Sequence, residues 1–217
     1  MVHSFGNGWR GGLIASALPV LCLAAAVLHA EPQLQIDSPQ NGQMVMAEGD
    51  LTVIVKTPDS VFQSISIVGE GPFALSTGIS APPYRFSYRI SAEFASGRYR
   101  FRAAGVTGFG ATVYSNPVEV DIEQSEKPKK LEAGCQSLSM IEHENAALVI
   151  WGTFANGSKV DLTRSTQIIY SSDRPAVAAV SNEGGVSASA VGKARIIVKY
   201  ADKTVLVPVV VTRSAAH

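Results

Sequence analysis

Apolar and polar residues alternate strictly along several short segments between residues 51 and 122. Successive side chains of a β-strand point to opposite faces, so a period of two predicts strands with one buried and one solvated face. Such strands are typical of two antiparallel sheets packed face to face. The positions expected to face inward are Leu51, Val53, Val55, Ile65, Ile67, Tyr84, Phe86, Tyr88, Ile90, Tyr99, Phe101, Ala103, Val118, Val120 and Ile122.

Short β-branched segments continue from residue 151 onward, and each ends in a turn signal. Asn156-Gly157 predicts a two-residue hairpin loop, because both residue types tolerate positive φ. Asp173 and Pro175 mark a further turn, and Gly192 permits a reversal before another strand. Regularly spaced short strands predict a second all-β sandwich, and no helix of useful length is expected in either sandwich.

The first thirty residues follow a different pattern. Arg10 precedes an apolar segment, residues 13–27, and a short stretch then leads to Ala30. This order predicts a secretory signal peptide over residues 1–30, cleaved after Ala30. The alternative is an uncleaved membrane anchor, because Leu28 is larger than the residue usual at that place before a cleavage site. The expected location is the periplasm, the cell surface or the medium, and no later segment is long enough to span a bilayer.

A charged, proline-containing stretch divides the remaining chain. It contains Lys127, Lys129 and Lys130 and shows no apolar periodicity, as expected of a solvated linker. We therefore predict one sandwich over residues 31–123, a linker over 124–130 and a second sandwich over 131–213.

Charge is balanced over the chain as a whole but not between its halves. Residues 31–125 contain six Lys and Arg against ten Asp and Glu, whereas residues 126–217 contain eleven against eight. Neither half has the concentrated basic face that nucleic-acid binding requires. Nucleic acid is therefore not an expected partner.

Two features are candidate ligand-binding sites. Arg98, Arg100 and Arg102 occupy every second position of one predicted strand and so share an outer face. They form either an anion-binding strip for polysaccharide or lipid head groups, or a solvated row paired with neighbouring acids. Phe109 lies between Gly108 and Gly110 at a predicted loop tip, where it is either an exposed contact residue or folded back onto the core.

The residues that carry common enzyme chemistry are few. After cleavage only His143 and the terminal His217 remain as histidines, and Cys135 is the sole cysteine, so no disulfide forms within the chain. Cys135 is either a small buried apolar residue or a thiol that pairs with another chain. No catalytic triad, zinc-ligand set or glycine-rich phosphate loop is recognisable. No catalytic, cofactor-binding or metal-ligating residues are predicted, and the chain is not expected to be an enzyme.

Residues from about 131 to 212 resemble the bacterial immunoglobulin-like domain of group 2, found in bacterial and phage surface proteins such as adhesins. The first sandwich is similar to bacterial immunoglobulin-like domains more generally, through Ile36–Gly42, Pro82-Pro83-Tyr84 and Gly97-Arg98-Tyr99. Tyr170 stands where the group 2 family often has Trp, and Lys193-Ala194-Arg195 replaces small residues after Gly192. The group 2 motifs are Gly152-Thr153-Phe154, Asn156-Gly157-Ser158, Asp161-Leu162-Thr163, Tyr170–Asp173, Pro175, Val177, Val180, Gly185-Val186, Gly192 and Val205–Val211.

The resemblance implies two tandem immunoglobulin-like sandwiches in an exported binding or adhesion protein. Its partner would be a protein or polysaccharide of the cell envelope or of a host surface. Two alternatives remain: a structural spacer or assembly subunit without its own ligand, and a carbohydrate-binding accessory module. Adhesion predicts an exposed apolar patch, a spacer predicts an ordered joint between the sandwiches, and an enzyme predicts a concave polar pocket.

Overall fold

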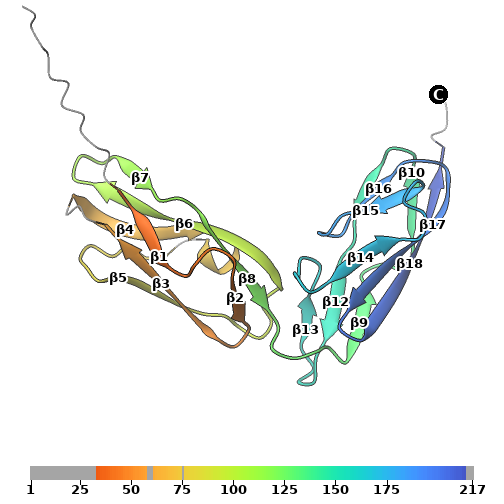
Figure 1. Cartoon of the computed structure of the whole chain (residues 1–217), viewed down its shortest axis with the longest axis horizontal. Helices are drawn as coiled ribbons and strands as arrows, with labels where there is room; N and C mark the ends of the chain where they lie inside the picture. The colour runs from red at the N-terminus through yellow and green to blue at the C-terminus, as the bar shows by residue number, and fades with distance from the viewer. Residues whose placement is uncertain (1–32, 58–60, 75, 214–217) are drawn as a thin grey trace, which may run out of the picture. The chain divides into compact units, whose positions relative to one another are not determined.

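The computed structural model describes residues 33–57, 61–74 and 76–213. The predicted signal peptide, with Arg10 and Ala30, lies outside the described residues. Within them the chain is built almost entirely from β-strands, with one short 3₁₀ helix, η1 (Gly71–Phe73). Both predicted sandwiches are present (Figure 1), so the all-β fold class is confirmed.

The first sandwich consists of two sheets. One has the strand order β1-β3-β5 and is antiparallel. The other has the order β2-β8-β6-β4, with β7 paired to β6. The strands are β1 (Gln35–Ser38), β2 (Gln43–Met46), β3 (Asp50–Lys56), β4 (Phe62–Gly69), β5 (Tyr84–Arg89), β6 (Gly97–Thr107), β7 (Thr112–Tyr114) and β8 (Val118–Glu123).

The side chains predicted to face inward form the core between these two sheets. Tyr84 and Tyr88 are half-buried at its edge, and the other predicted positions are buried. At the centre, Phe101 and Phe73 have ring centroids 4.2 Å apart, and Tyr88 meets Phe73 edge-on at 5.0 Å. The alternation along the sequence therefore predicted the buried face of this sandwich.

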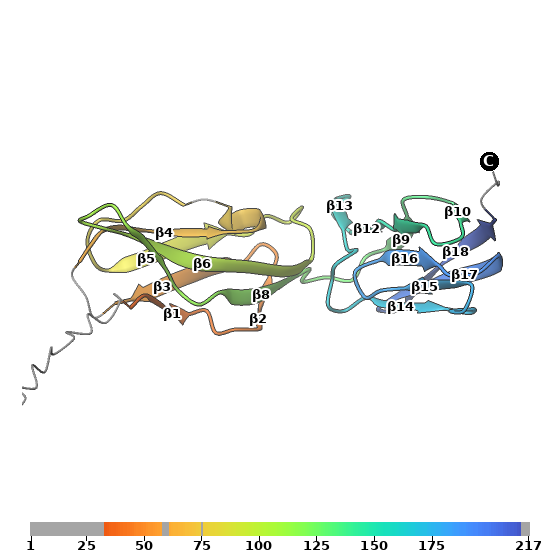
Figure 2. The same ribbon diagram turned by 90° about the horizontal axis from the view of Figure 1, so that it is seen from above.

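The second sandwich contains three groups of paired strands, with the orders β10-β18-β17-β14, β13-β12-β9 and β11-β16-β15 (Figure 2). A separate hydrophobic core lies between them, formed by residues from Leu131 to Val211. The strands are β9 (Lys130–Ala133), β10 (Leu138–Ile141), β11 (Asn145–Ala147), β12 (Ile150–Thr153), β13 (Lys159–Asp161), β14 (Ile169–Ser172), β15 (Ala178–Val180), β16 (Gly185–Ala188), β17 (Gly192–Tyr200) and β18 (Lys203–Thr212).

The two sandwiches begin in the same way. In the first, β1 pairs with β3, and the chain then crosses to the opposite sheet, where β2 runs parallel to the last strand, β8. In the second, β9 pairs with β12, and β10 then runs parallel to the last strand, β18. In each sandwich the first two strands are consecutive in the chain but lie in different sheets, so the chain links the two layers at one edge.

The Asn156-Gly157 hairpin is present, but its loop is one residue longer than predicted. Phe154 N–H donates to the Ser158 carbonyl at 2.9 Å, and Gly157 N–H donates to the Phe154 carbonyl at 3.1 Å. Only Gly157 has positive φ, at 84°. This is the three-residue loop in which a tight turn is followed by a left-handed glycine. The prediction of a two-residue loop was therefore wrong, because Asn156 adopts ordinary negative φ.

Truncating the centre of the first core should destabilise that sandwich strongly. Phe101 is 1% exposed, so Phe101→Ala leaves a cavity that the rigid sheets cannot close. We expect a loss of about 3–5 kcal/mol in the free energy of unfolding, measured by urea denaturation. Ser87→Ala, on the exposed side of β5, is the control and should change it by less than about 0.5 kcal/mol. Equal effects of the two substitutions would contradict this placement of the core.

The second sandwich should lose stability in alkaline solution. Burial, and then the negative charge of Asp161, raise the pKa of Tyr170, whose hydroxyl donates to the Thr163 carbonyl at 2.9 Å. Burial, and then the charge of Glu123, raise the pKa of Tyr200. A tyrosine in the unfolded chain ionises near its ordinary pKa of about 10, whereas these two stay protonated while folded. The stability they contribute is therefore complete below pH ~10 and is lost as the pH rises through the folded-state pKa.

We expect the free energy of unfolding to fall above pH ~10 by up to about 1.4 kcal/mol per pH unit for each of the two tyrosines. Trp151 fluorescence during urea denaturation would report it. Tyr170→Phe should make this fall less steep, and replacement of the exposed Tyr114 by Phe should leave it unchanged. An unaltered slope for Tyr170→Phe would show that burial of this hydroxyl does not link folding to pH.

Candidate functional site

One face of β8 presents three acidic side chains, and the register of the sheet decides what each of them meets. In the pairing of β6 with β8, Arg100 stands opposite Glu119 and Arg98 opposite Asp121. The pairing ends at Gly97, which stands opposite Ile122, so β6 has no residue to offer Glu123. The first two acids therefore find cations within their own sandwich, and the third does not.

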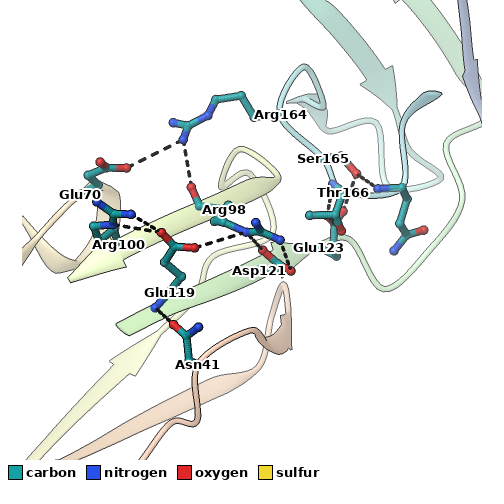
Figure 3. Close-up of polar contacts among 11 residues, drawn as sticks. Asn41, Glu70, Arg98, Arg100, Glu119, Asp121, Glu123, Arg164, Ser165 and Thr166 are labelled. Atoms are coloured by element: carbon teal, nitrogen blue, oxygen red, sulfur yellow. Dashed lines mark hydrogen bonds and ion pairs between the residues drawn. The ribbon is translucent and has the colours of Figure 1, made fainter. Parts of the chain in front are cut away.

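The predicted arginine row is engaged by these acids (Figure 3). Arg98 donates from Nε to Asp121 Oδ1 at 2.9 Å and from Nη2 to Oδ2 at 3.3 Å. Arg100 donates from Nη2 to Glu119 Oε1 at 2.6 Å. The hydrogen bond with Asp121 is the main reason why the pKa of Arg98 is raised. Two of the three guanidinium groups are thus neutralised on the sheet that carries them.

Arg102 takes a different partner. Its guanidinium carbon lies 3.8 Å from the centroid of the Tyr114 ring, on the neighbouring strand β7. Arg85 and Arg89 lie on β5 in the other sheet of the sandwich, and Arg89 pairs with Asp50 at 3.2 Å. The two groups of arginines therefore stay separate. An anion would have to compete with acids or an aromatic ring at each of the positions 98, 100 and 102.

Glu123 is completely buried, and its carboxylate is bound by the second sandwich (Figure 3). Ser165 Oγ donates to Oε2 at 2.6 Å, Thr166 N–H donates to Oε1 at 2.7 Å, and Thr166 Oγ1 donates to Oε1 at 2.9 Å. A buried carboxylate is tolerated only when such donors replace water. The two sandwiches belong to one compact unit of the chain, and this contact is the joint between them.

The turn that supplies these donors is held in shape from within the second sandwich. Asp161 Oδ1, at the end of β13, accepts hydrogen bonds from both the backbone N–H and the hydroxyl of Thr163. Thr163 Oγ1 in turn accepts from Ile150 N–H at 2.9 Å, which ties the turn to β12. Ser165 and Thr166 are thus placed for Glu123 by hydrogen bonds within the second sandwich.

A second line of contacts runs beside Glu123. Ser96 N–H donates to the Asp161 carbonyl at 2.9 Å, and Gly97 forms a parallel bridge with Arg164. Gly97 has φ of 150°, and a Cβ added there would lie 2.8 Å from Arg164 Cβ, so the two backbones approach closely only because this residue is glycine. Arg164 Nη2 donates to the Arg98 carbonyl at 3.1 Å and lies 3.9 Å from Glu70 Oε2.

The predicted linker is anchored at its first residue. Gln124 is buried, and its Nε2 donates to the Phe94 carbonyl at 3.0 Å. Lys127, Lys129 and Lys130 are exposed. Reasoning from the sequence missed Glu123, Ser165 and Thr166. Glu123 could have been singled out as the one acid of β8 with no cation opposite it on β6. That comparison requires the strand register, which only the structure supplies.

Phe109 lies at the tip of the β6–β7 hairpin and is 101% exposed, so it does not fold back onto the core. Thr107 N–H donates to the Ala111 carbonyl at 2.9 Å, and Gly110 N–H donates to the Thr107 carbonyl at 2.9 Å. This is the same pair of hydrogen bonds that closes the turn from Phe154 to Ser158. The tip is therefore an ordered turn that presents one aromatic side chain to solvent.

Two hollows among the described residues are open to solvent. One of them, beside the joint, has a volume of about 440 Å³ and includes Arg98, Arg164 and Ile169 in its lining. A second, of about 320 Å³ on the second sandwich, is lined by Cys135, Val149 and Trp151 with smaller apolar residues, and Cys135 is a free thiol. Among the described residues, no cluster of His, Cys, Asp and Glu could hold a metal ion. In the same part of the chain no helix is long and apolar enough to cross a membrane.

The ion pairs of the arginine row should add little stability. Asp121 is buried, but Arg98 is more than half exposed, so water and salt reach the guanidinium and screen the pair. A double-mutant cycle of Arg98→Ala and Asp121→Ala, measured by thermal unfolding, should give a coupling of about 1 kcal/mol or less, smaller still in 1 M salt. A coupling of several kcal/mol that is insensitive to salt would show that this pair behaves as a buried contact.

No protein-family model matches the chain, and no curated protein matches it. Solved structures similar to it include fibronectin(III)-like modules of CbhA from Clostridium thermocellum, with 15% identity, 85% of this chain and 98% of that chain covered, and a TM-score of 0.39. Domains 4 and 5 of the S-layer protein SbsC are 17% identical over 84% of this chain and 98% of that chain, with a TM-score of 0.36. A β-glucuronidase from Parabacteroides merdae is 11% identical over 83% of this chain and 24% of its own, also with a TM-score of 0.36. These structures supply no function for the chain.

Proposed function

We propose that the chain is an exported, non-enzymatic structural module, a spacer or assembly subunit in which two tandem immunoglobulin-like sandwiches hold a fixed relation to each other. The observation that carries this proposal is the joint, where the buried carboxylate of Glu123 accepts three hydrogen bonds from Ser165 and Thr166. A flexible tether between independent binding modules would leave Glu123 in water. Its burial against the other sandwich holds the two together, as a spacer that transmits geometry requires.

The division at residues 124–130, the export of the chain through residues 1–30 and the membership of residues 131–212 in the group 2 bacterial immunoglobulin-like domains are parts of the same proposal. Separate hydrophobic cores on the two sides of the charged stretch support the division. Fixed geometry suits a protein of the periplasm, the cell surface or the medium, where envelope structures must be spaced or joined.

An enzymatic role has little support in the surface of the described residues. Four hollows on these residues are open to solvent, and none of the four brings together a nucleophile, a base and an oxyanion-binding group. The pKa values raised by burial include those of Tyr170 and Tyr200, which serve packing.

A second candidate function is binding or adhesion through Phe109, and its full exposure is the observation that favours it. The partner would be a protein or polysaccharide of the cell envelope or of a host surface. The other large exposed apolar side chains are scattered over both sandwiches, and single ones of that kind are normal on protein surfaces. Adhesion would therefore act through this one loop rather than through a broad apolar patch.

The joint is tested by the rotational motion of the two sandwiches. In the wild-type protein, ¹⁵N relaxation should give one correlation time for both, because the joint makes them tumble together. Glu123→Gln keeps the size of the side chain but replaces an acceptor oxygen by an amide donor that faces Ser165 and Thr166. We expect the two sandwiches to acquire separate, shorter correlation times. The free energy of interaction between them should weaken by roughly 2 kcal/mol.

Glu119→Gln is the matched control, because Glu119 lies on the same strand and the same face but pairs with Arg100 inside the first sandwich. It should leave the common correlation time unchanged. Independent tumbling of the sandwiches in the wild-type protein would overturn the proposal of a fixed spacer.

A further inference from the structure

Phe109 plays no part in building the turn that carries it. The turns 107–111 and 154–158 share their backbone hydrogen bonds, and by position Phe109 corresponds to Asn156. Asn156 stabilises its turn by accepting a hydrogen bond from Ser158 N–H at 2.9 Å. In the first sandwich that task falls to Thr107 Oγ1, which accepts from Ala111 N–H at 3.2 Å. Polar residues are favoured at such positions, so the turn itself does not explain an aromatic side chain at 109.

A large apolar side chain fully in water gains free energy when a partner covers it. Phe109 is 101% exposed, and its neighbour Gly110 has no atom within 4 Å of the place where a Cβ would lie, so none of the residues that the structure describes covers the tip. Glycine on both sides lets the ring enter a recess without a collision of neighbouring side chains. The Phe109 side chain, which we call the knob, is thus a single exposed apolar group on an ordered turn.

The second sandwich carries a recess of matching character, which we call the Trp151 pocket. Its volume is about 320 Å³, and it opens widely to solvent, so an aromatic ring from another molecule can reach the Trp151 side chain. No charged side chain lines it, and Lys159 lies over the Trp151 ring at 5.3 Å from the centroid. Its lining consists of Gly134, Cys135, Leu138, Ala147, Val149 and Trp151.

The net charges of the two halves favour contact between unlike halves of two copies. Residues 31–125 carry a net charge of −4, from six basic and ten acidic residues. Residues 126–217 carry +3, from eleven basic and eight acidic residues. The half with the knob and the half with the pocket therefore attract each other in different copies, whereas like halves repel. The whole chain has no net charge to oppose association.

We propose that Phe109 of one copy inserts into the Trp151 pocket of a second copy, so that the protein assembles head to tail. The two surfaces in this contact are different, so each copy keeps one free knob and one free pocket, and the assembly can extend as an open chain. This inference rests on the proposed function as an assembly subunit and names its partner as a second copy of the same chain.

A disulfide trap tests the contact directly, because Cys135 lines the pocket. In the full chain carrying Cys22→Ser, the further substitution Phe109→Cys should place a thiol beside Cys135 of another copy. Mild oxidation should then produce a ladder of covalent oligomers, with a 109–135 cross-link found by mass spectrometry. Asn156→Cys, at the equivalent place of the other turn, is the control and should give no ladder, and adding Cys135→Ser should abolish the one formed by Phe109→Cys. Cross-linking of Phe109→Cys no greater than that of Asn156→Cys would overturn the proposal.

A mixing experiment tests the head-to-tail arrangement without a new covalent bond. Phe109→Ser removes the knob, and Val149→Glu puts a charge at the half-exposed rim of the pocket. Each variant alone should associate at least about tenfold more weakly than the wild type in sedimentation velocity, as for loss of an interface anchor. A 1:1 mixture should give dimers and nothing longer, because only one productive contact remains. Circular dichroism confirms that both variants are folded.

A mixture that stays monomeric, or a single variant that still forms chains, would overturn the proposal. So would a Phe109→Ser variant that assembles normally but loses capture by purified envelope polysaccharide or protein, which would instead support the adhesion role. Failure of the head-to-tail assembly can be told apart from failure of the fixed joint within one copy. Glu123→Gln loosens the joint within a copy and should leave the 109–135 cross-link between copies intact.

Discussion

A carboxylate that has lost contact with water must be supplied with hydrogen bonds, and Glu123 is such a carboxylate. Its donors come from the other sandwich, so neither sandwich satisfies this region alone. The close approach of Gly97 to Arg164 and the anchoring of Gln124 on Phe94 surround the same point. The arrangement of the two sandwiches in this protein therefore depends on one buried charge at the end of β8.

The three acidic residues of β8, Glu119, Asp121 and Glu123, have different roles. Glu119 and Asp121 meet Arg100 and Arg98 across the sheet, in contacts whose arginine side chains are exposed to water and salt although Asp121 itself is buried. Such pairs keep a polar face soluble and hold it in register, and they add little to stability. Glu123 lies one step beyond the last residue of β6 in that register. Its charge is buried, and its hydrogen bonds are worth more because water cannot replace them.

The two matching turns have one position that their backbone conformation fixes and one that it does not. Both 107–111 and 154–158 need a glycine in the left-handed region, at Gly110 and Gly157, and both have it. The position before that glycine is not fixed by the backbone, and it holds Phe109 in one turn and Asn156 in the other. Local geometry therefore does not demand the exposed aromatic ring of Phe109, which leaves it free for the contact with a second copy that we propose.

The sequence by itself determined the strands, their buried faces and the all-β class, because the period of two and the turn residues are local properties of the chain. It also placed the arginines of β6 on one outer face and Phe109 at a loop tip. It gave the wrong loop length at Asn156, since two neighbouring turn types share the same Asn-Gly signal. The partners of Glu123 were decided only by the tertiary structure, because residues 123 and 165 are brought together by strand register and by the packing of two separate cores, which no local pattern records.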